Sequence, residues 1–467
     1  MKPLYVLVLA AGQGTRMKSA LPKVLHPVAG RPLLEHVLRV VQALHPKDIG
    51  VVVGIGREKI QEVLRTGLPA GRQGWKKLHY VVQEKPLGSG HAVLMAKTWL
   101  KPKHGSLLVV YGDTPLLTTQ TLHRLVEHHA VSGNAATFLA MDMPDPSGYG
   151  RMVLDTHGYL ERIVEERDAA PHERAITLVN SGVACWDIQM LLAVLPRLKA
   201  DNAKREYYLT DAAALLRVLG GRVGVVRAKN PDETHGINTR VDLARAEAIY
   251  RRRILEHWMR EGVTIVDPAS TYIDSEAVIL PDTRLWPGTV IQGASRIGSH
   301  CEIGPYTLVE SAVVEDGACV GPFARLRPGT VVGERARIGN FVEIKKSAIG
   351  KGSKVNHLSY LGDSTVGAGV NIGAGTITCN YDGVAKYRTV IEDEVFVGSN
   401  ANLVAPIRLG RGAIIGAGST ITKDVPADAL AVARGRQVTK EGWAKNRRAQ
   451  REARKSELSE QKTGGGD

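Results

Sequence analysis

An apolar residue recurs every six positions through the second half of this chain, and few folds accommodate such a period. Ile291, Ile297 and Ile303 begin the series and Ile415 and Ile421 end it, with the spacing shortened to five at three places. Glycine usually follows the apolar residue, as expected at a corner that needs unusual backbone angles. The period is typical of a parallel β-helix, in which short strands make each coil and the apolar side chains fill a prism.

The first half of the chain has a different pattern, in which short apolar runs alternate with helical stretches. The runs are continuous and rich in β-branched side chains, as in strands buried on both faces, and they cover residues 6–9, 49–53, 107–110 and 223–226. Residues 32–44 and 119–129 have helical patterns between them. Alternation of this kind predicts an α/β domain with a mainly parallel, Rossmann-like sheet.

These patterns divide the chain into four expected parts. An α/β domain covers residues 1–235, a linker helix 236–262, and a left-handed parallel β-helix of hexapeptide repeats 263–439. Residues 440–467 form a charged C-terminal arm and basic tail, which we expect to be partly disordered beyond about Asn446 because it lacks a long apolar run.

The composition indicates which partners and which cellular compartment suit the chain. The net charge of +14 favours anionic partners such as phosphorylated metabolites or nucleic acid. The four cysteines have no close spacing, which argues against a disulfide framework or a thiolate zinc cluster and fits a reducing compartment. No apolar run is long enough for a transmembrane helix, so we expect a cytoplasmic protein without a membrane span.

A phosphate-binding loop follows the first apolar run. Gly12-Gln13-Gly14-Thr15 comes directly after that run, where backbone N–H groups can cradle phosphate oxygens. Arg16 and Lys23 then add two cations, which suit a triphosphate and the charge that develops in phosphoryl transfer. Asp113 follows the run at 107–110, at a strand end where α/β ligand sites form, and its carboxylate is a natural ligand for Mg²⁺.

The segment from Leu9 to Leu25, of pattern LxxGxGTRMxxxxPKxL, resembles the signature of the sugar-phosphate nucleotidyltransferases. Later segments, including Gly148–Arg151, Val179–Gly182 and Gly236–Thr239, resemble the bacterial bifunctional family that makes UDP-N-acetylglucosamine. The resemblance covers about residues 3–445. It implies UDP-N-acetylglucosamine pyrophosphorylase and glucosamine-1-phosphate N-acetyltransferase activities, which supply a precursor of peptidoglycan and lipopolysaccharide.

For the first half, the resemblance implies residues that contact UTP and the sugar nucleotide: Leu9, Ala10, Ala11, Gly12, Gly14, Lys23, Gln83, Gly88, Ser89, Tyr111, Gly112, Asp113, Gly150, Glu165, Asn180 and Asn238. Within this set it assigns uracil recognition to Gln83, Gly88 and Ser89, and the sugar phosphate to Gly150, Glu165 and Asn180. It places Mg²⁺ on Asp113 and Asn238, and it makes Arg16 and Lys23 catalytic. The family commonly has Thr at the position of Ser89, which keeps the hydroxyl group.

In the second half, interruptions of the repeat are the informative positions. A loop from Thr378 to Thr389 breaks the period with polar residues and an aromatic, and loops that leave a solenoid usually carry function. Acyl transfer to an amine needs a base, and His357 is a suitable candidate. Segments such as Gly350–Asp363 and Asn371–Gly383 resemble the acetyltransferase half of the same bifunctional family.

That resemblance makes His357 the general base and implies homotrimers whose acetyltransferase sites lie between subunits. It assigns glucosamine-1-phosphate to Arg327, Lys345, Tyr360 and Asn371. It assigns acetyl-CoA to Ala374, Asn380, Tyr381, Ser399, Ala417 and Arg434, with the backbone N–H near Ala374 facing the oxyanion.

Two other readings stay open at this point. The β-helix could serve only to trimerise or regulate a sugar-1-phosphate nucleotidyltransferase, because a fold by itself does not give function. The basic charge could also mark a nucleic-acid-binding protein, although aromatic residues make up only 5% of the chain and no nucleic-acid-binding module stands out. Residues 67–75 look like an insertion on the surface, with no role assigned.

Overall fold

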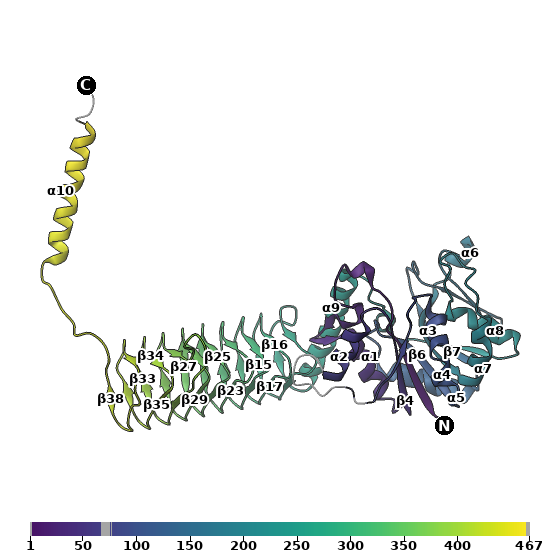
Figure 1. Cartoon of the computed structure of the whole chain (residues 1–467), viewed down its shortest axis with the longest axis horizontal. Coiled ribbons are helices and arrows are strands. Elements are labelled where there is room, and N and C mark those ends of the chain that lie inside the picture. The colour runs from purple at the N-terminus through teal and green to yellow at the C-terminus, as the bar shows by residue number, and fades with distance from the viewer. Residues whose placement is uncertain (1, 67–74, 76, 464–467) are drawn as a thin grey trace. The chain divides into compact units, whose positions relative to one another are not determined.

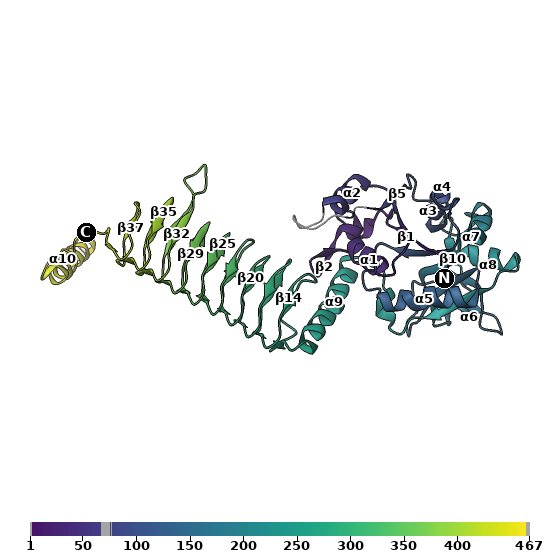
Figure 2. The same cartoon turned by 90° about the horizontal axis from the view of Figure 1, so that it is seen from below.

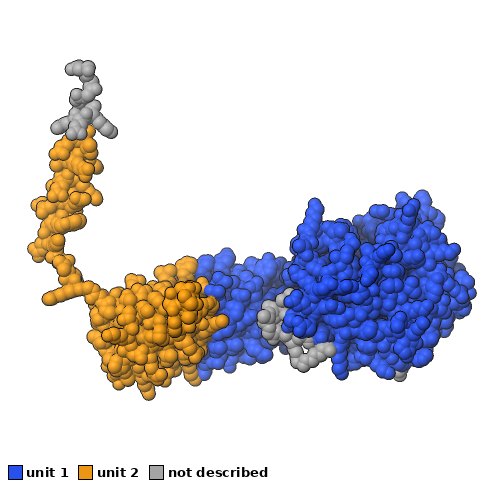
Figure 3. Space-filling model, viewed as in Figure 1, with its two compact units in different colours: residues 1–335 blue, residues 336–467 orange. Residues whose placement is uncertain are grey.

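The computed structural model describes residues 2–66, 75 and 77–463 (Figure 1). Except for Trp75, the insertion predicted at 67–75 lies outside the described residues. The chain forms two compact units, residues 1–335 and 336–467, which Figure 3 colours separately. The boundary between these units falls within the run of hexapeptide repeats, so the four-part division drawn from the sequence stays a prediction.

The N-terminal part is built on one twisted sheet whose strands run in the order β11 (Val223–Arg227), β7 (Ala136–Asp142), β10 (Leu178–Asp187), β6 (Ser106–Tyr111), β1 (Leu4–Leu9), β4 (Asp48–Val53) and β5 (His79–Val82). Strands β6, β1, β4 and β5 are parallel neighbours, as are β11 and β7. Strand β10 runs antiparallel to both β6 and β7. A hairpin, β8 (Arg151–Leu154) and β9 (Leu160–Val164), extends from β10. The predicted mainly parallel α/β sheet is confirmed.

Helices cover both faces of this sheet. One apolar cluster joins a face of the sheet to α1 (Leu33–Gln42), α2 (Arg57–Thr66) and α5 (Thr119–Ser132). A second cluster joins the other face to four helices, α3 (Ser89–Met95), α4 (Lys97–Leu100), α7 (Ile188–Val194) and α8 (Ala212–Val218). With both faces buried, the continuous Val and Leu runs of the central strands are explained. A short helix, α6 (Pro171–Arg174), completes the helices up to residue 239 of the described chain.

A long helix, α9 (Arg240–Arg260), follows and packs against the same unit through Ala246 and its apolar neighbours. A capping box starts it: the Thr239 side chain accepts a hydrogen bond from the Asp242 N–H, and the Asp242 carboxylate accepts from the Thr239 N–H at 2.8 Å. The same carboxylate accepts from the N–H of Asn238 at 3.0 Å. The helix start therefore fixes the backbone of Asn238.

The repeats form three parallel sheets of short strands, as predicted (Figures 1 and 2). In residues 1–335 the strands are β12 (Thr264–Ile265), β15 (Arg284–Leu285), β18 (Glu302–Ile303) and β21 (Cys319–Val320) in the first sheet, β13 (Tyr272–Ile273), β16 (Val290–Gln292), β19 (Leu308–Glu310) and β22 (Arg325–Leu326) in the second, and β14 (Val278–Ile279), β17 (Arg296–Ile297), β20 (Val313–Val314) and β23 (Val331–Val332) in the third.

In residues 336–467 the strands are β24 (Arg337–Asn340), β27 (Lys354–His357), β30 (Asn371–Ile372), β33 (Phe396–Val397), β36 (Ile414–Ile415) and β38 (Leu430–Ala431) in the first sheet, β25 (Glu343–Lys345), β28 (Tyr360–Gly362), β31 (Ile377–Cys379), β34 (Asn402–Val404) and β37 (Thr420–Ile421) in the second, and β26 (Ala348–Ile349), β29 (Ser364–Val366), β32 (Thr389–Ile391) and β35 (Ile407–Leu409) in the third.

The interior of the coils is aliphatic, and its members, such as Ile291, Leu326 and Ile415, are almost fully buried. Each such side chain contributes about 1.5–3 kcal/mol relative to an exposed one. Buried hydroxyls bridge successive coils: Thr283 donates to the Gly298 carbonyl at 2.7 Å. Since a buried hydroxyl without a partner is costly, these bonds let small polar residues occupy the corners.

The C-terminal tail contains a helix that the apolar pattern did not predict, because Trp443–Thr463 forms α10. The partial disorder expected beyond about Asn446 stays a prediction. Ala, Arg, Lys, Glu and Gln dominate this segment and all have high helix propensity, which a search for apolar runs overlooks. The described side chains of α10, residues 443–458, are exposed.

Candidate active sites

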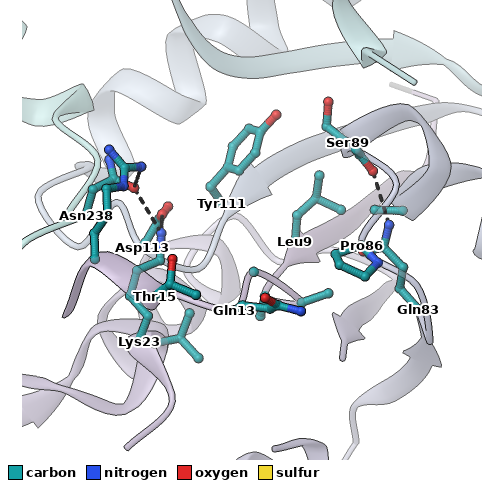
Figure 4. A pocket seen from close by; sticks show the side chains of 18 of the residues that line it. Leu9, Gln13, Thr15, Lys23, Gln83, Pro86, Ser89, Tyr111, Asp113 and Asn238 are labelled. Atoms are coloured by element: carbon teal, nitrogen blue, oxygen red, sulfur yellow. Dashed lines mark hydrogen bonds and ion pairs between the residues drawn. The ribbon is translucent and has the colours of Figure 1, made fainter. Parts of the chain in front are cut away.

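A cavity of about 510 Å³ opens at the carboxyl ends of β1 and β6, within residues 1–335 (Figure 4). The predicted residues that line it are Leu9, Ala10, Ala11, Gly12, Gly14, Arg16, Lys23, Gln83, Gly88, Ser89, Tyr111, Asp113 and Asn238. Figure 4 shows Lys23, Asp113 and Asn238 at one end and Gln83 and Ser89 at the other, with Leu9 and Tyr111 between them. The structure thus brings together most of the nucleotide site predicted from sequence.

The glycine-rich loop follows β1 and tightens into a single 3₁₀ turn, Thr15–Met17. Gly14 has a φ of 65°, and a Cβ on it would lie 2.5 Å from the Cβ of Lys23. Only glycine fits here without displacing the lysine. The loop therefore packs on the aliphatic part of the Lys23 side chain, and Lys23 lines the cavity.

The charged end of the cavity is one network of cations and oxygens. The Lys23 ammonium group contacts Oδ2 of Asp113 in a short ion pair and lies 3.3 Å from Oδ1 of Asn238. The same Asn238 oxygen accepts a hydrogen bond from Nη2 of Arg16 at 2.9 Å. The Ile237 N–H donates to the Asp113 carbonyl at 2.9 Å, which holds the two oxygen-bearing residues side by side.

This donor set fits Mg²⁺. Hard carboxylate and amide oxygens are the ligands that the ion prefers, and it is often held by one or two carboxylates together with substrate phosphates. The oxygens of Asp113 and Asn238 already converge on one cation, the Lys23 ammonium group. Within the described residues no group of three or more His, Cys, Asp or Glu side chains could hold a metal ion, so phosphate oxygens would have to complete the site.

The opposite end of the cavity is shaped by two segments far apart in sequence. Nε2 of Gln83 donates to the Gly88 carbonyl at 3.1 Å, and Oγ of Ser89 accepts from the Leu209 N–H at 3.1 Å. A Cβ on Gly88 would lie 2.6 Å from the carbonyl oxygen of Tyr207, so this close approach requires glycine. The packing of residues 206–209 here brings Glu206 into the lining.

Several lining residues were missed from sequence: Gln13, Thr15, Val24, Pro86, Ala92 and Glu206. Gln13 and Thr15 lie within the glycine-rich motif, so the motif itself was the available signal. Glu206 opens the segment Glu206–Asp211, which carries part of the resemblance but gives no sign of which cavity it faces.

Gly112, Gly150, Glu165 and Asn180 do not line the cavity. Gly112 is a close-packing residue, because a Cβ there would lie 3.1 Å from Leu34 and 3.2 Å from Ala10. The other three lie together: the Asn180 N–H donates to the Gly150 carbonyl at 2.8 Å, and a Cβ on Gly150 would lie 3.2 Å from Oε1 of Glu165.

Tyr111 connects that cluster to the cavity. A Cβ on Gly182 would lie 2.7 Å from its ring, and the Asn180 side chain accepts from the Gly182 N–H at 3.0 Å. Burial, with the charges of Asp113 and Glu165, raises the pKa of Tyr111 to about 12, so the phenol stays neutral. Burial also raises the pKa of Glu165, opposed by nearby Lys204.

In the β-helix, His357 ends β27 and lies opposite Asn340 in the register of β24 and β27. Nδ1 of His357 is 3.0 Å from Oδ1 of Asn340, and the His357 side chain is exposed. The registers of β27, β30, β33 and β36 put Val355, Ile372, Val397 and Ile415 in one interior column. Two residues beyond each, at the same corner, stand His357, Ala374, Ser399 and Ala417.

The hydrogen bonds of this corner confirm that the coils stack there. The Asn400 N–H donates to the Ala374 carbonyl at 2.7 Å, and the Gly418 N–H donates to the Ser399 carbonyl at 2.8 Å. Nη1 of Arg434 donates to the Ala417 carbonyl at 2.8 Å. The predicted acetyl-CoA residues Ala374, Ser399, Ala417 and Arg434 therefore follow His357 along one edge.

Other predicted acetyltransferase residues lie at a second corner. Lys345 is opposite Gly362 in the register of β25 and β28, where a Cβ on Gly362 would lie 2.4 Å from Oη of Tyr360. Nδ2 of Asn380 donates to Asp363 at 2.6 Å. From Asn380 the loop between β31 and β32 leaves the coil (Figure 2), and it carries Tyr381, whose side chain is 58% exposed.

Two predicted residues stand apart from this corner. Asn371 is the first residue of β30 and lies opposite Lys354 of β27. Arg327 follows β22 and belongs to the unit of residues 1–335, so its contact with glucosamine-1-phosphate stays a prediction.

Comparison with known proteins gives separate matches for the α/β part and for the repeat part of the chain. A family model of the MobA-like NTP transferase domain matches residues 6–177, and one of the GMPPB C-terminal domain matches residues 308–407. A bifunctional GlmU protein of Geobacillus thermodenitrificans is 47% identical over 96% of this chain and 99% of its own length. The chain belongs to the GlmU family.

Other GlmU proteins agree with this assignment. The bifunctional GlmU proteins of Caldanaerobacter subterraneus and Carboxydothermus hydrogenoformans are 47% and 48% identical, over 96% and 94% of this chain and 99% of each relative. The bifunctional transferase function predicted from sequence is confirmed: the chain is a glucosamine-1-phosphate acetyltransferase and a uridylyltransferase of UDP-N-acetylglucosamine synthesis. Among the described helices of the chain, none combines the length and apolar character needed to cross a bilayer.

Proposed function

We propose that the two activities are carried out at separate sites, uridylyl transfer in the cavity beside the glycine-rich loop and acetyl transfer at the corner that carries His357. The observation that supports this most is the convergence of Lys23, Arg16 and Asn238 with Asp113 at one end of a cavity that the glycine-rich loop lines. Two cations beside such a loop suit a triphosphate.

In the cavity, we propose that Gln83, Gly88 and Ser89 hold the uracil end of UTP, while the loop N–H groups, Arg16 and Lys23 hold its phosphates. The phosphate of N-acetylglucosamine-1-phosphate attacks the α-phosphorus of UTP in line. A new P–O bond forms, the bond between the α- and β-phosphates breaks, and pyrophosphate leaves. Arg16 and Lys23 stabilise the negative charge that builds up on the phosphates and on the leaving group.

Mg²⁺ would be held by Asp113 and Asn238 together with phosphate oxygens, and when bound it neutralises phosphate charge. The sugar end of the substrate is assigned to Gly150, Glu165 and Asn180, which cluster behind Tyr111 rather than in the lining of the cavity. Binding of the sugar phosphate would then extend the site past Tyr111 towards Glu165.

At the second site, His357 acts as the general base. The Asn340 side chain presents its oxygen to Nδ1 of His357, so Nδ1 carries the proton and Nε2 is left to accept one from the amine of glucosamine-1-phosphate. The amine nitrogen then attacks the thioester carbon of acetyl-CoA, the Ala374 N–H faces the developing oxyanion, and the C–S bond breaks. CoA leaves as the thiol after the proton passes from His357.

The edge that runs from His357 through Ala374, Ser399 and Ala417 to Arg434 supports a groove for acetyl-CoA. Glucosamine-1-phosphate is assigned to Arg327, Lys345, Tyr360 and Asn371, and the exposed loop residues Asn380 and Tyr381 are assigned to acetyl-CoA. We also propose that the protein works in the cytoplasm as a homotrimer with acetyltransferase sites between subunits, and that it supplies precursor for peptidoglycan and lipopolysaccharide.

A pair of variants tests whether the two activities use separate sites. His357→Ala should lower acetyl transfer by at least about 100-fold and leave uridylyl transfer unchanged. Arg16→Ala should have the opposite effect, because it removes a cation that bonds Asn238 at the proposed phosphate site. Unchanged acetylation in His357→Ala would favour the alternative in which the β-helix only trimerises or regulates.

A further inference from the structure

The Lys23 ammonium group occupies the position at which the two proposed metal ligands converge. It contacts the Asp113 carboxylate and lies 3.3 Å from the Asn238 oxygen. Both partners of the ion pair are largely buried, with the Lys23 side chain 11% exposed and that of Asp113 17% exposed. A cation thus already balances the carboxylate that would receive Mg²⁺.

The charges at this end of the cavity argue against entry of a free metal ion. Arg16 and Lys23 supply two positive charges beside the Asp113 carboxylate, and both donate to one oxygen of Asn238. The nearby Asp242 carboxylate already accepts from the N–H groups of Asn238 and Thr239. A divalent ion placed between Asp113 and Asn238 would lie within a few ångströms of both cations, and like charges repel strongly at that distance in a partly buried site. Phosphate oxygens would relieve this repulsion by drawing the ammonium group towards themselves.

The glycine-rich loop beside Lys23 allows the ammonium group to move from the metal ligands to the phosphates with little rearrangement. Gly14 packs on the Cβ of Lys23, so the first part of the side chain is held in place and only its end has to turn. The same loop is the proposed cradle for the phosphates, so the ammonium group lies between the metal ligands and the position of the incoming nucleotide.

We propose that Lys23 is a placeholder cation: it fills the metal position in the free protein, excludes free Mg²⁺, and moves to the phosphates when nucleotide and metal arrive together. This inference rests on the proposed function, since it uses the metal site on Asp113 and Asn238. It makes metal binding depend on nucleotide through one side chain.

The test measures Mn²⁺ binding to the full chain by electron paramagnetic resonance, without substrates, for the wild type, Lys23→Gln and Lys23→Met. Both variants should bind Mn²⁺ at least about tenfold more tightly than the wild type, because the competing charge is gone. Adding Asp113→Asn to Lys23→Gln should abolish the gain. Lys85→Gln, at an exposed lysine outside the lining of the cavity, should bind Mn²⁺ like the wild type.

Equal Mn²⁺ affinity in the wild type and in variants whose thermal melts show them folded would overturn the placeholder role. A gain that persists with Asp113→Asn would overturn it as well, because the metal would then bind elsewhere. The proposed metal site has its own readout: with UTP present, the wild type should bind Mn²⁺ tightly and Asp113→Asn should not. Tight binding by Asp113→Asn with UTP would reject that metal site and, with it, the placeholder.

Discussion

Nδ1 of His357 lies 3.0 Å from Oδ1 of Asn340, one coil away in the register of β24 and β27. An amide oxygen only accepts hydrogen bonds, so this contact fixes which ring nitrogen carries the proton. It also holds an exposed side chain in one orientation at the edge of the β-helix. Asn340 is therefore a positioning residue for the proposed base.

Asn340→Ala should lower kcat for acetyl transfer by about tenfold or more, because His357 loses its orientation and its preferred tautomer. KM for acetyl-CoA should change little, since Asn340 belongs to the coil before His357 and the proposed acetyl-CoA edge runs the other way. Steady-state kinetics of CoA release measure both. Asn402→Ala, in β34 of another sheet, serves as the control. A raised KM for acetyl-CoA with a normal kcat would contradict a positioning role.

Gly14→Ala should reduce uridylyl transfer by at least about 100-fold and leave acetyl transfer intact. The new Cβ would lie 2.5 Å from that of Lys23, at a φ of 65° that alanine rarely adopts. Pyrophosphate release reports the loss. Gly158→Ala has the same backbone strain, with a φ of 80°, but meets nothing within 4 Å. Equal losses in the two variants would point to strain alone.

Arg31 makes a buried ion pair within the unit of residues 1–335, between the start of α1 and the first coils. Nη2 of Arg31 lies 2.7 Å from Oε1 of Glu276, and the side chains are 11% and 13% exposed. Arg31→Met should lower the free energy of unfolding by about 1–3 kcal/mol, because it removes the closest cation from a buried carboxylate and leaves Arg39, 3.6 Å from the same Glu276 oxygen, to compensate it. Urea denaturation measures this. Arg57→Met, at the exposed pair with Glu58, should change it much less, because solvent screens that pair.

Burial raises the pKa of Asp211 to about 6, with repulsion from Asp201, Glu165 and Asp168. The folded protein then binds a proton that the unfolded chain releases, so this group lowers stability as pH rises from about 4 to 6. Asp211→Asn should raise the free energy of unfolding at pH 7.5 by about 1–2 kcal/mol, after allowance for partial exposure. The gain should vanish below about pH 4.

Thermal melts across pH follow this difference between Asp211→Asn and the wild type. Asp145 gives the opposite case, because hydrogen bonds from Ser147 lower the pKa of its carboxyl group. That group stabilises the fold at neutral pH and the effect fades as pH falls, so Asp145→Asn should not gain stability at pH 7.5. A pH-independent effect of Asp211→Asn would contradict the assigned cause.

The fold was largely predictable because each half has one dominant sequence pattern, apolar runs that alternate with helical stretches in the first half and a six-residue period in the second. The six-residue spacing from Ile291 to Ile421 fixes which side chains face inward, and the continuous runs such as 107–110 mark strands covered on both faces. Helix α10 was missed because it has no apolar stripe, and only intrinsic propensity signals it. Its exposed side chains leave no packing pattern in the sequence.

The sites were predictable where a short motif holds all the parts, as in the loop from Gly12 to Arg16. They were not predictable where contacts join distant segments. The contact of Glu206 with the cavity depends on residues 206–209 packing against Gly88. Asn340 was missed, although the repeat contains a signal for it. Ile338 and Val355 occupy the same interior column, so Asn340 and His357, two residues beyond them, share a corner.

One coupled assay tests whether the chain holds two active transferase sites. The full chain is supplied with glucosamine-1-phosphate, acetyl-CoA, UTP and Mg²⁺, and free CoA and pyrophosphate are followed together. Both products should appear, with pyrophosphate lagging behind CoA because the acetylated sugar must form first. Release of only CoA, or of only pyrophosphate, would contradict the presence of two active sites.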